Sequence, residues 1–339
     1  MCFNKLSNKK PKIKEQVPGI GLCEVEKKTA YSCRTGFQQA KLKIIKGVIM
    51  NGAIALLCLI WGLNWVVMKQ ANQVFPPVLF TTYRFILGSG VLLIVTYFKK
   101  IPIPRREDWK WVILGGILQT AFFNTAVQVG MQFLSAGFSS VLSYSMPFWV
   151  AIMAHFLLGE KLTRRKMTGV AMGMVGLVAL LNVSGGGAWW AIVLTLTGAV
   201  AWAFSSILVK LKLQHCDILQ YTTWQMVVGA IVLSIYSALF GHGTIQWGWY
   251  AVGCLVYNGV LASALAYFLW TYILSNTEAG KASISMLIIP IIGVLAGVIF
   301  LKETLYWNTV VGMALILGGI WLVNGHTASR EIESIQQGD

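Results

Sequence analysis

The stretch that decides the fold is residues 135–163, SAGFSSVLSYSMPFWVAIMAHFLLGEKLT. It contains no Asp, Glu, Lys or Arg before Glu160, and it shows no alternation of polar and apolar residues. A helix of about 20 mainly apolar residues is long enough to cross the hydrocarbon core of a bilayer. The absence of a two-residue period argues against a strand of an outer-membrane barrel. We therefore predict a transmembrane helix here.

Nine further apolar stretches of similar length follow the same pattern, with short connections between them. The chain is therefore expected to be an all-α integral membrane protein with ten transmembrane helices. Besides 135–157, the predicted spans lie near 48–68, 77–98, 111–131, 165–183, 188–209, 218–240, 248–274, 280–301 and 305–324.

The composition agrees with a membrane protein and excludes several other classes. Of 339 residues, 56% are hydrophobic and only 12% are charged, about half the roughly 25% charged share of soluble domains. A water-soluble enzyme, a disordered chain and a disulfide-stapled secreted module are thereby excluded. The net charge of +15 raises the question of a nucleic-acid partner, so the positions of the basic residues matter.

Much of that charge belongs to a basic tail, residues 1–47, which holds eleven Lys and Arg and three Glu. We expect this tail to be cytoplasmic and without fixed structure, and we expect residues 325–339 to form a cytoplasmic C-terminal tail. Contact with anionic lipid head groups is an alternative, and so is a true start at Met50, in which case residues 1–49 would not be native. Only three aromatic residues lie in the tail, so we do not expect it to bind nucleic acid by stacking.

Basic residues in the loops predict the orientation. With the N-terminus inside, twelve Lys and Arg fall in inner loops and two, Lys69 and Lys302, in outer loops. We therefore expect a multi-pass protein of the cell membrane with both termini in the cytoplasm.

The second half of the chain repeats the first. The stretch 278–305, EAGKASISMLIIPIIGVLAGVIFLKETL, follows 135–163 at a separation of 143 residues, and Thr81–Arg84 match 222–225 at a separation of 141. A collinear series of matches indicates duplication, with copies at 48–183 and 188–324. Because five helices are an odd number, the copies are expected to be inverted relative to one another, as in many secondary transporters that work by alternating access.

These stretches, with WGLNWVVMK at 61–69 and TTYRF at 81–85, resemble the drug/metabolite transporter superfamily, specifically the EamA-type ten-helix carriers. The resemblance covers about residues 50–325. It implies a secondary transporter of small organic metabolites, such as amino acids or drug-like solutes, and more specifically an exporter. A flippase for a lipid-linked intermediate is the alternative that this superfamily leaves open.

Two prolines occupy equivalent positions in the repeats. Pro147 and Pro290 are predicted near the middle of the fourth and ninth helices, where each removes a backbone donor and displaces a carbonyl, that of Ser143 or Met286. Paired breaks of this kind point to a transport site. A packing kink without ligand contact is the alternative.

Arg84 is the one clear charge inside a predicted span. It is expected to face the bundle interior and to hold a partner. One interpretation is a fixed cation for a substrate carboxylate or phosphate. The other is a structural bond to helix-end carbonyls or a side chain that extends to the outer interface. Its counterpart in the repeat is the neutral Gln225.

Polar and aromatic side chains inside the spans describe a mixed cavity suited to zwitterions or amphiphilic metabolites. Each is alternatively a bond between helices or an interface anchor. No Asp or Glu lies well inside a span, which favours exchange or efflux over steep proton-coupled uptake. The candidate cavity residues besides the arginine and the prolines are Trp61, Asn64, Gln119, Asn124, Tyr144, Trp202, Gln225, Asn258, Tyr267 and Ser283.

Other functions find little support. The six cysteines show neither metal spacing nor a paired pattern, and no nucleophile–base motif is present, so no metal, cofactor or enzyme activity is expected. Glycines of the fifth and tenth helices (Gly169, Gly173, Gly176, Gly312 and Gly319) form small-residue faces. These are expected to pack helices within the molecule, with a homodimer as the alternative.

Overall fold

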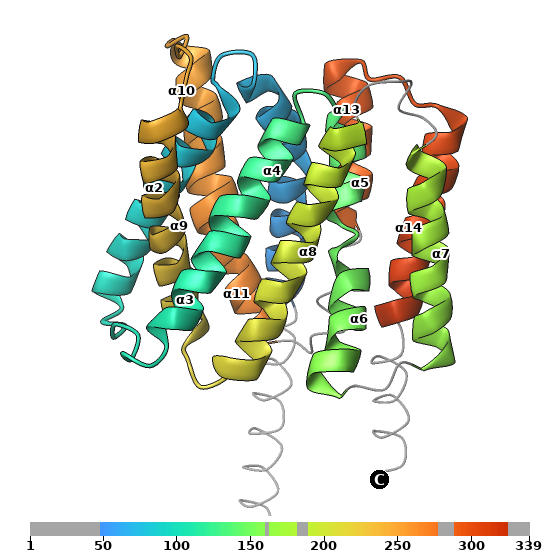
Figure 1. Ribbon diagram of the computed structural model, residues 1–339. Helices are drawn as coiled ribbons and strands as arrows, with labels where there is room; N and C mark the ends of the chain where they lie inside the picture. Colours follow the sequence, from blue (N-terminus) through green and yellow to red (C-terminus); the bar gives the residue numbers. More distant parts are fainter. Residues whose placement is uncertain (1–47, 160–162, 182–188, 277–287, 325–339) are drawn as a thin grey trace, which may run out of the picture. The chain divides into compact units, whose positions relative to one another are not determined.

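The computed structural model describes residues 48–159, 163–181, 189–276 and 288–324, and all regular structure within these ranges is helical (Figure 1). The chain divides into two units, residues 1–51 and 52–339. Of the first unit only residues 48–51 are described, and they begin the helix Val48–Ala71. All contacts given below lie within the second unit.

The first repeat continues from this helix through four further spans. Two of the spans are composite: the third contains a π-helical segment and the fourth is broken. The elements are α2 (Pro77–Phe98), α3 (Trp109–Gly115), the π-helix η1 (Gly116–Phe122), α4 (Phe123–Gly130), α5 (Ala136–Ser143), α6 (Met146–Leu158) and α7 (Arg164–Leu181).

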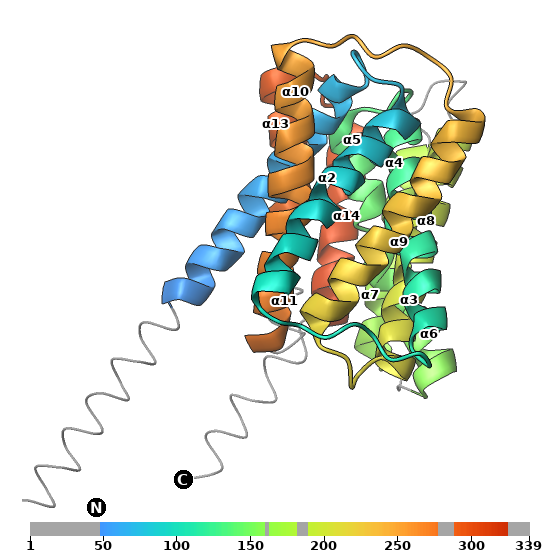
Figure 2. The same cartoon turned by 90° about the vertical axis from the view of Figure 1, so that its left-hand side faces the viewer.

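The second repeat follows the same order, and its third span also contains a π-helical segment. Figure 2 shows the connection 241–248 running over the ends of the helices from α9 to α10. The elements are α8 (Trp189–Lys212), α9 (Ile218–Phe240), α10 (Trp249–Val256), the π-helix η2 (Tyr257–Leu265), α11 (Ala266–Asn276), α13 (Ile288–Leu301) and α14 (Trp307–Asn324).

Within the described residues, seven helical segments are long and apolar enough to cross a membrane. Three further helices, α7, α13 and α14, coincide with the remaining predicted stretches. Helix α13 has 14 residues, and α7 begins with three basic residues; residues 277–287 lie outside the described ranges. The predicted all-α membrane fold is confirmed.

Helix ends follow local sequence signals. Pro77 begins α2 at a position where its missing N–H is not needed. The side chain of Ser135 accepts from the N–H of Phe138 at the start of α5, and Asp217 does the same for Gln220 in α9. Gly159 ends α6 with φ at 68°, a left-handed conformation that glycine adopts without strain. These signals fix where the spans begin and end.

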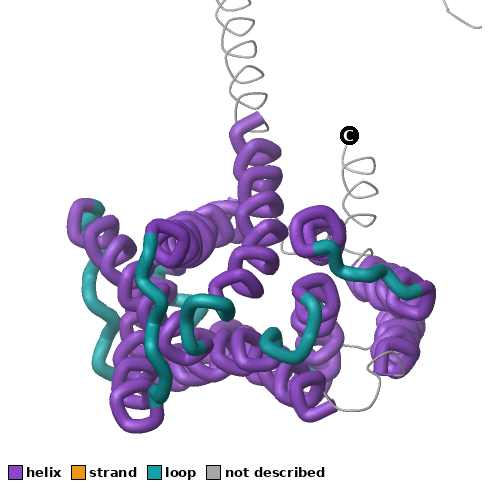
Figure 3. Tube along the Cα trace, turned by 90° about the horizontal axis from the view of Figure 1, so that it is seen from above, coloured by secondary structure: helices purple, strands orange, loops and turns teal. Residues whose placement is uncertain are grey.

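Helices of one repeat pair with their equivalents in the other. The second spans, α2 and α9, pack together, as do α5 with α13 and α7 with α14. The third span of the first repeat packs on α8, and reciprocally the helix Val48–Ala71 bonds to η2 through the indole N–H of Trp61 and the carbonyl of Ala262 at 2.9 Å. Figure 3 looks along the helices and shows loops joining them at this end. The core is therefore shared between the repeats.

The predicted small-residue faces meet inside the molecule. A Cβ atom on Gly176 would lie 2.8 Å from the carbonyl oxygen of Gly312, and one on Gly319 would lie 2.5 Å from that of Gly169. The backbones of α7 and α14 therefore approach closely along this face. These glycines are used for packing within the molecule, and this packing gives no support to a homodimer through the same face.

Candidate substrate cavity

A cavity lies among the middle parts of six spans. About 70 Å³ of it is accessible to the centres of water molecules, several times the roughly 10–15 Å³ that one water needs. The walls combine aromatic rings with a few polar groups, and the lining residues, all in the described part of the chain, include no Asp or Glu. They are Trp61, Asn64, Trp65, Met68, Arg84, Phe123, Asn124, Val127, Ser143, Tyr144, Met146, Trp202, Ala262 and Tyr267.

Arg84 is the cation of this cavity. Only 4% of its surface is exposed. Its Nη2 donates to Oδ1 of Asn124 at 2.6 Å, and its Nη1 donates to Oδ1 of Asn258 at 3.1 Å. Both partners are neutral amides, so the positive charge is oriented by hydrogen bonds but is not neutralised by them. The interior position predicted for Arg84 is confirmed, and an extended side chain at the interface is ruled out.

The two π-helices position both asparagines. Asn124 is the second residue of α4, one residue beyond the end of η1, and its Nδ2 donates to the carbonyls of Gln119 and Thr120 at 2.9 and 3.0 Å. Both carbonyls belong to η1, and π-helical turns are frequent at functional sites. With its donors satisfied, Asn124 turns its oxygen to Arg84. Asn258 lies in η2, so each repeat contributes one asparagine to the arginine.

Aromatic rings enclose the cavity. Trp61 contacts Tyr267 with ring centroids 5.8 Å apart, Phe123 lies 4.5 Å from Trp202, and Trp65 lies 6.5 Å from Tyr144. Rings in these edge-to-face arrangements present both apolar surface and π-faces. The walls can therefore contact an aliphatic chain or an ammonium group.

Three polar atoms at the cavity have no hydrogen-bond partner among the described residues: Nε of Arg84, Oδ1 of Asn64 and Oγ of Ser143. All three residues line the space. A buried polar atom without a partner costs about 1–3 kcal/mol. These atoms supply a charged donor, an acceptor and a hydroxyl that acts as either.

The break in the fourth span lies beside the cavity. The chain leaves helical geometry after Ser143, turns at Tyr144 and Ser145, and begins α6 at Met146. Pro147 therefore lies in the first turn of a new helix, where its missing N–H has no intrahelical acceptor to lose. Pro147 lies near the middle of the span Ala136–Leu158, as predicted, and the break lies directly before it; the displacement of the Ser143 carbonyl stays a prediction. The break itself is real and brings Ser143 and Tyr144 to the cavity wall.

Seven of the thirteen predicted site residues line the cavity: Trp61, Asn64, Arg84, Asn124, Tyr144, Trp202 and Tyr267. Asn258 is not itself a lining residue, but it accepts a hydrogen bond from Arg84, which is one. Ser283 lies outside the described residues. The other four, Gln119, Pro147, Gln225 and Pro290, are not among the lining residues.

The structure shows where three of those four lie instead. Gln119 accepts from the hydroxyl of Ser205 at 3.1 Å and so joins η1 to α8. Gln225 is buried against Gly115 and Gly116, because α9 packs on η1. Pro290 is buried in α13, which packs on α5.

Sequence reasoning missed several wall residues. Trp65 and Met68 follow Trp61 and Asn64 at helical spacing on one face of the first helix, and this periodicity was the available signal. Val127 lies one turn beyond Asn124 in the same way. Ala262 carried no signal, because an alanine in an apolar span does not distinguish a cavity wall from a packed core.

Comparisons with known proteins identify the family. A model of the EamA-like transporter family matches residues 48–182 and, a second time, residues 189–325. An uncharacterized transporter, YoaV, of Bacillus subtilis is 31% identical over 290 residues, which cover 83% of this chain and 98% of the relative.

Two further comparisons agree. A protein of Salmonella typhimurium named a probable amino-acid metabolite efflux pump is 27% identical over 285 residues, covering 80% of this chain and 94% of that protein. A solved crystal structure superposes with a TM-score of 0.62 at 18% identity, covering 84% of this chain and 99% of the other, which shows a shared fold. The chain thus belongs to the EamA-like transporter family of the drug/metabolite transporter superfamily, with one family domain in each half.

Proposed function

We propose that this membrane transporter exports small zwitterionic metabolites, with amino acids as the leading class, by alternating access. The observation that carries the proposal is Arg84: a buried cation with a free Nε, in a cavity whose walls contain no acid. A substrate carboxylate fits this position because a charge-assisted hydrogen bond to a guanidinium is among the strongest polar contacts in a dry site.

The ammonium group of a zwitterionic substrate also has partners in the cavity. Oδ1 of Asn64 and Oγ of Ser143 are free acceptors, and the rings of Trp61 and Trp202 offer π-faces to an ammonium group. The remaining wall is apolar, as an aliphatic or aromatic side chain requires. A doubly charged anion or a sugar lacks this match.

Export is supported by two considerations. Relatives in Salmonella typhimurium and Escherichia coli are named probable amino-acid metabolite efflux pumps. The cavity walls hold no carboxylate, and steep proton-coupled uptake commonly uses one within the membrane. We further propose the cell membrane as the location and cytoplasmic termini as the orientation, from the distribution of loop cations.

Alternating access is supported by the pairing of equivalent helices across the repeats. Two inverted halves around one central cavity exchange their conformations by rocking, which opens the same cavity to either side. The break between α5 and α6, at the cavity wall, gives one span two rigid parts that can move separately.

The test uses the purified full-length protein in proteoliposomes loaded with a metabolite mixture. Mass spectrometry reads what crosses, with and without a pH gradient. We expect amino acids to be transported, and their decarboxylated amines and methyl esters to be transported at least about tenfold less well, the equivalent of roughly 1.4 kcal/mol.

Variants of the arginine sharpen this test. Arg84→Gln should remove the preference for the carboxylate, while Arg84→Lys should keep part of it because the charge remains. Flux of lipid-linked substrates alone, or an equal preference for acid and amine in the wild type, would overturn the proposal.

A further inference from the structure

Two loops at one end of the molecule bring together an aspartate, a histidine and a cysteine. Asp108 precedes α3, and His215 and Cys216 lie between α8 and α9. The carboxylate of Asp108 is only 4% exposed, whereas the imidazole of His215 is 45% exposed. A buried carboxylate at a partly open surface, faced by two metal-ligating side chains, is an arrangement that transport through the central cavity does not use.

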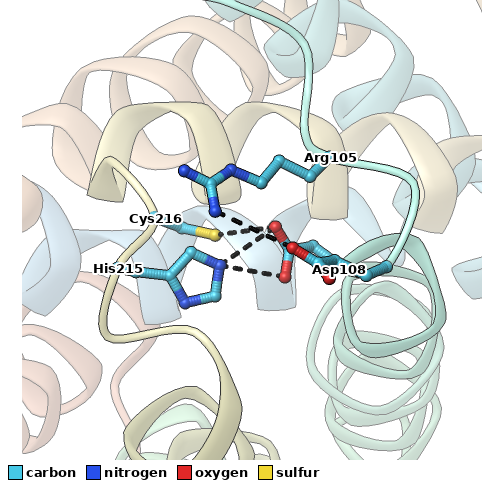
Figure 4. Close-up of polar contacts among 5 residues, drawn as sticks. Arg105, Asp108, His215 and Cys216 are labelled. Carbon is cyan, nitrogen blue, oxygen red and sulfur yellow. Dashed lines mark hydrogen bonds and ion pairs between the residues drawn. The ribbon is translucent and has the colours of Figure 1, made fainter.

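The three side chains converge on one point (Figure 4). Nε2 of His215 lies 3.0 and 3.1 Å from the two carboxylate oxygens of Asp108, and Sγ of Cys216 lies 3.6 Å from Oδ2. All three ligand atoms lie within 4.8 Å of one another. His215 and Cys216 are adjacent in sequence, but the chain turns here, with the N–H of Cys216 donating to the carbonyl of Leu213.

These separations suit a tetrahedral zinc ion. Zinc bonds of about 2.0–2.1 Å to nitrogen and oxygen and about 2.3 Å to sulfur place tetrahedral N and O ligands about 3.3 Å apart, and S and O ligands about 3.5 Å apart. The observed values differ from these by only a few tenths of an ångström.

The chemistry of the donors selects zinc as well. Imidazole, thiolate and carboxylate are the three ligand types of zinc sites. Magnesium and calcium prefer sets made of oxygen, of which this site supplies one side chain. Aspartate and a cysteine thiolate together carry the two negative charges that balance a divalent cation.

We propose that Asp108, His215 and Cys216 form a zinc-binding site that links the α2–α3 loop of the first repeat to the α8–α9 loop of the second. On binding, the Cys216 thiol loses its proton to solvent as the sulfur–zinc bond forms. The three protein ligands leave the fourth position to water. No sequence pattern indicated this site, because Asp108 and His215 are 107 positions apart and no Cys-x-x-Cys pair is present.

A zinc ion here joins the two repeats at one end of the bundle. If the repeats rock against each other in the transport cycle, a bridged pair of loops resists their separation and slows transport. This consequence rests on the proposed function, whereas metal binding does not, so the two are tested separately.

Binding is measured on the full-length protein, purified without a histidine tag. Cys2, Cys23 and Cys33 are replaced by serine in the background, because they belong to the tail outside the described residues and are thiols themselves. We expect one zinc per chain by elemental analysis after dialysis, and a sulfur-to-cobalt charge-transfer band when Co²⁺ replaces zinc.

Matched variants assign the ligands. His215→Ala, Cys216→Ser and Asp108→Asn should each weaken zinc binding at least about tenfold in competition with a chromophoric chelator. The controls His242→Ala and Cys254→Ser remove the same residue types elsewhere and should bind as the parent does. His215→Ala also keeps the buried carboxylate and thiol together, so it remains informative if Asp108→Asn fails to fold.

The outcomes decide the proposal. Absence of bound zinc and of the cobalt–thiolate band, or equal affinity in the parent and in His215→Ala and Cys216→Ser, would show that the cluster is only a hydrogen-bonded tie between loops. If zinc binds but the transport rate stays unchanged, the zinc site stands, and the claim that bound zinc slows the movement of the repeats is overturned. Absence of any transport would bear on the proposed function and leave the binding result standing.

Discussion

Nη1 of Arg84 donates to Oδ1 of Asn258 at 3.1 Å, and this bond joins α2 of the first repeat to the π-helix η2 of the second. The other oxygen partner of Arg84, Asn124, belongs to the first repeat. The central cation is therefore held between the two halves of the molecule, at the place where a substrate carboxylate is proposed to bind.

The two asparagines differ in a way that allows a sharp prediction. Nδ2 of Asn258 has no hydrogen-bond partner among the described residues, so Asn258→Asp loses no bond and places a carboxylate on Arg84. We expect this variant to reach the membrane at wild-type abundance and to transport amino acids at least about tenfold less well, chiefly through a higher KM, because the internal carboxylate competes with that of the substrate.

Asn124→Asp is the matched comparison. It replaces the two donors to the carbonyls of Gln119 and Thr120 with an oxygen that faces those carbonyls. Leaving them without a partner costs about 1–3 kcal/mol, so thermal stability in detergent should fall in this variant and not in Asn258→Asp. Equal transport by Asn258→Asp and wild type would argue against a substrate carboxylate at Arg84.

A second prediction concerns the break between α5 and α6. Pro147→Ala restores an N–H four residues after the carbonyl of Ser143, which permits one continuous helix. We expect abundance to stay unchanged and transport to fall several-fold, because the two parts of the span no longer move separately. Pro77→Ala, at the start of α2 after a loop, is the control and should transport normally. A parallel loss of abundance and transport in Pro147→Ala would leave the break with a packing role alone.

Much of this arrangement follows from the sequence for a physical reason. A polar side chain in the middle of an apolar span has no partner in lipid, so it must face protein or a cavity. That rule correctly placed Arg84, Asn64 and Asn124 inside. It does not say which neighbour a side chain meets, and Gln225 therefore satisfied the rule while packing on η1 instead of lining the cavity.

The rest depends on tertiary contacts that no local pattern records. The side chain of Asn124 donates to a carbonyl of η1. The carbonyl of Ala262, in η2, accepts from the indole of Trp61, although the two residues are 201 positions apart in the chain. The meeting of Asp108 with His215 likewise depends on how the two repeats are packed. Residue types and periodicity cannot supply such pairings.

A third prediction tests the close contact of α7 with α14. Gly176→Ala and Gly319→Ala each place a methyl group within 3 Å of backbone atoms of the facing helix. Overpacking of this kind costs about 1–3 kcal/mol, so both variants should lose their folded form at lower temperature in fluorescence-detected size-exclusion chromatography. Gly90→Ala, whose new methyl group meets nothing within 4 Å, is the control. Wild-type stability in all three variants would mean that the helices separate readily, and would reopen this face to a homodimer.

The last prediction concerns Glu303, which lies beyond α13 and caps a helix of the other repeat. Its Oε1 and Oε2 accept from the N–H groups of Ala136 and Gly137 at 2.6 and 3.2 Å, where the positive end of the α5 dipole favours a carboxylate. Glu303→Ala leaves both donors without that acceptor and should cost about 1–2 kcal/mol of stability. Glu303→Gln keeps one acceptor oxygen and should cost less.

Glu107→Ala is the matched control, because Glu107 pairs with Arg105 at 3.7 Å while both side chains are more than 70% exposed. Such surface pairs contribute little, so its thermal stability should match that of the wild type. If Glu303→Ala is as stable as this control, the cap does not hold α5 to the end of α13. If it is less stable and also transports more slowly, the contact that joins the repeats at this end takes part in the transport cycle.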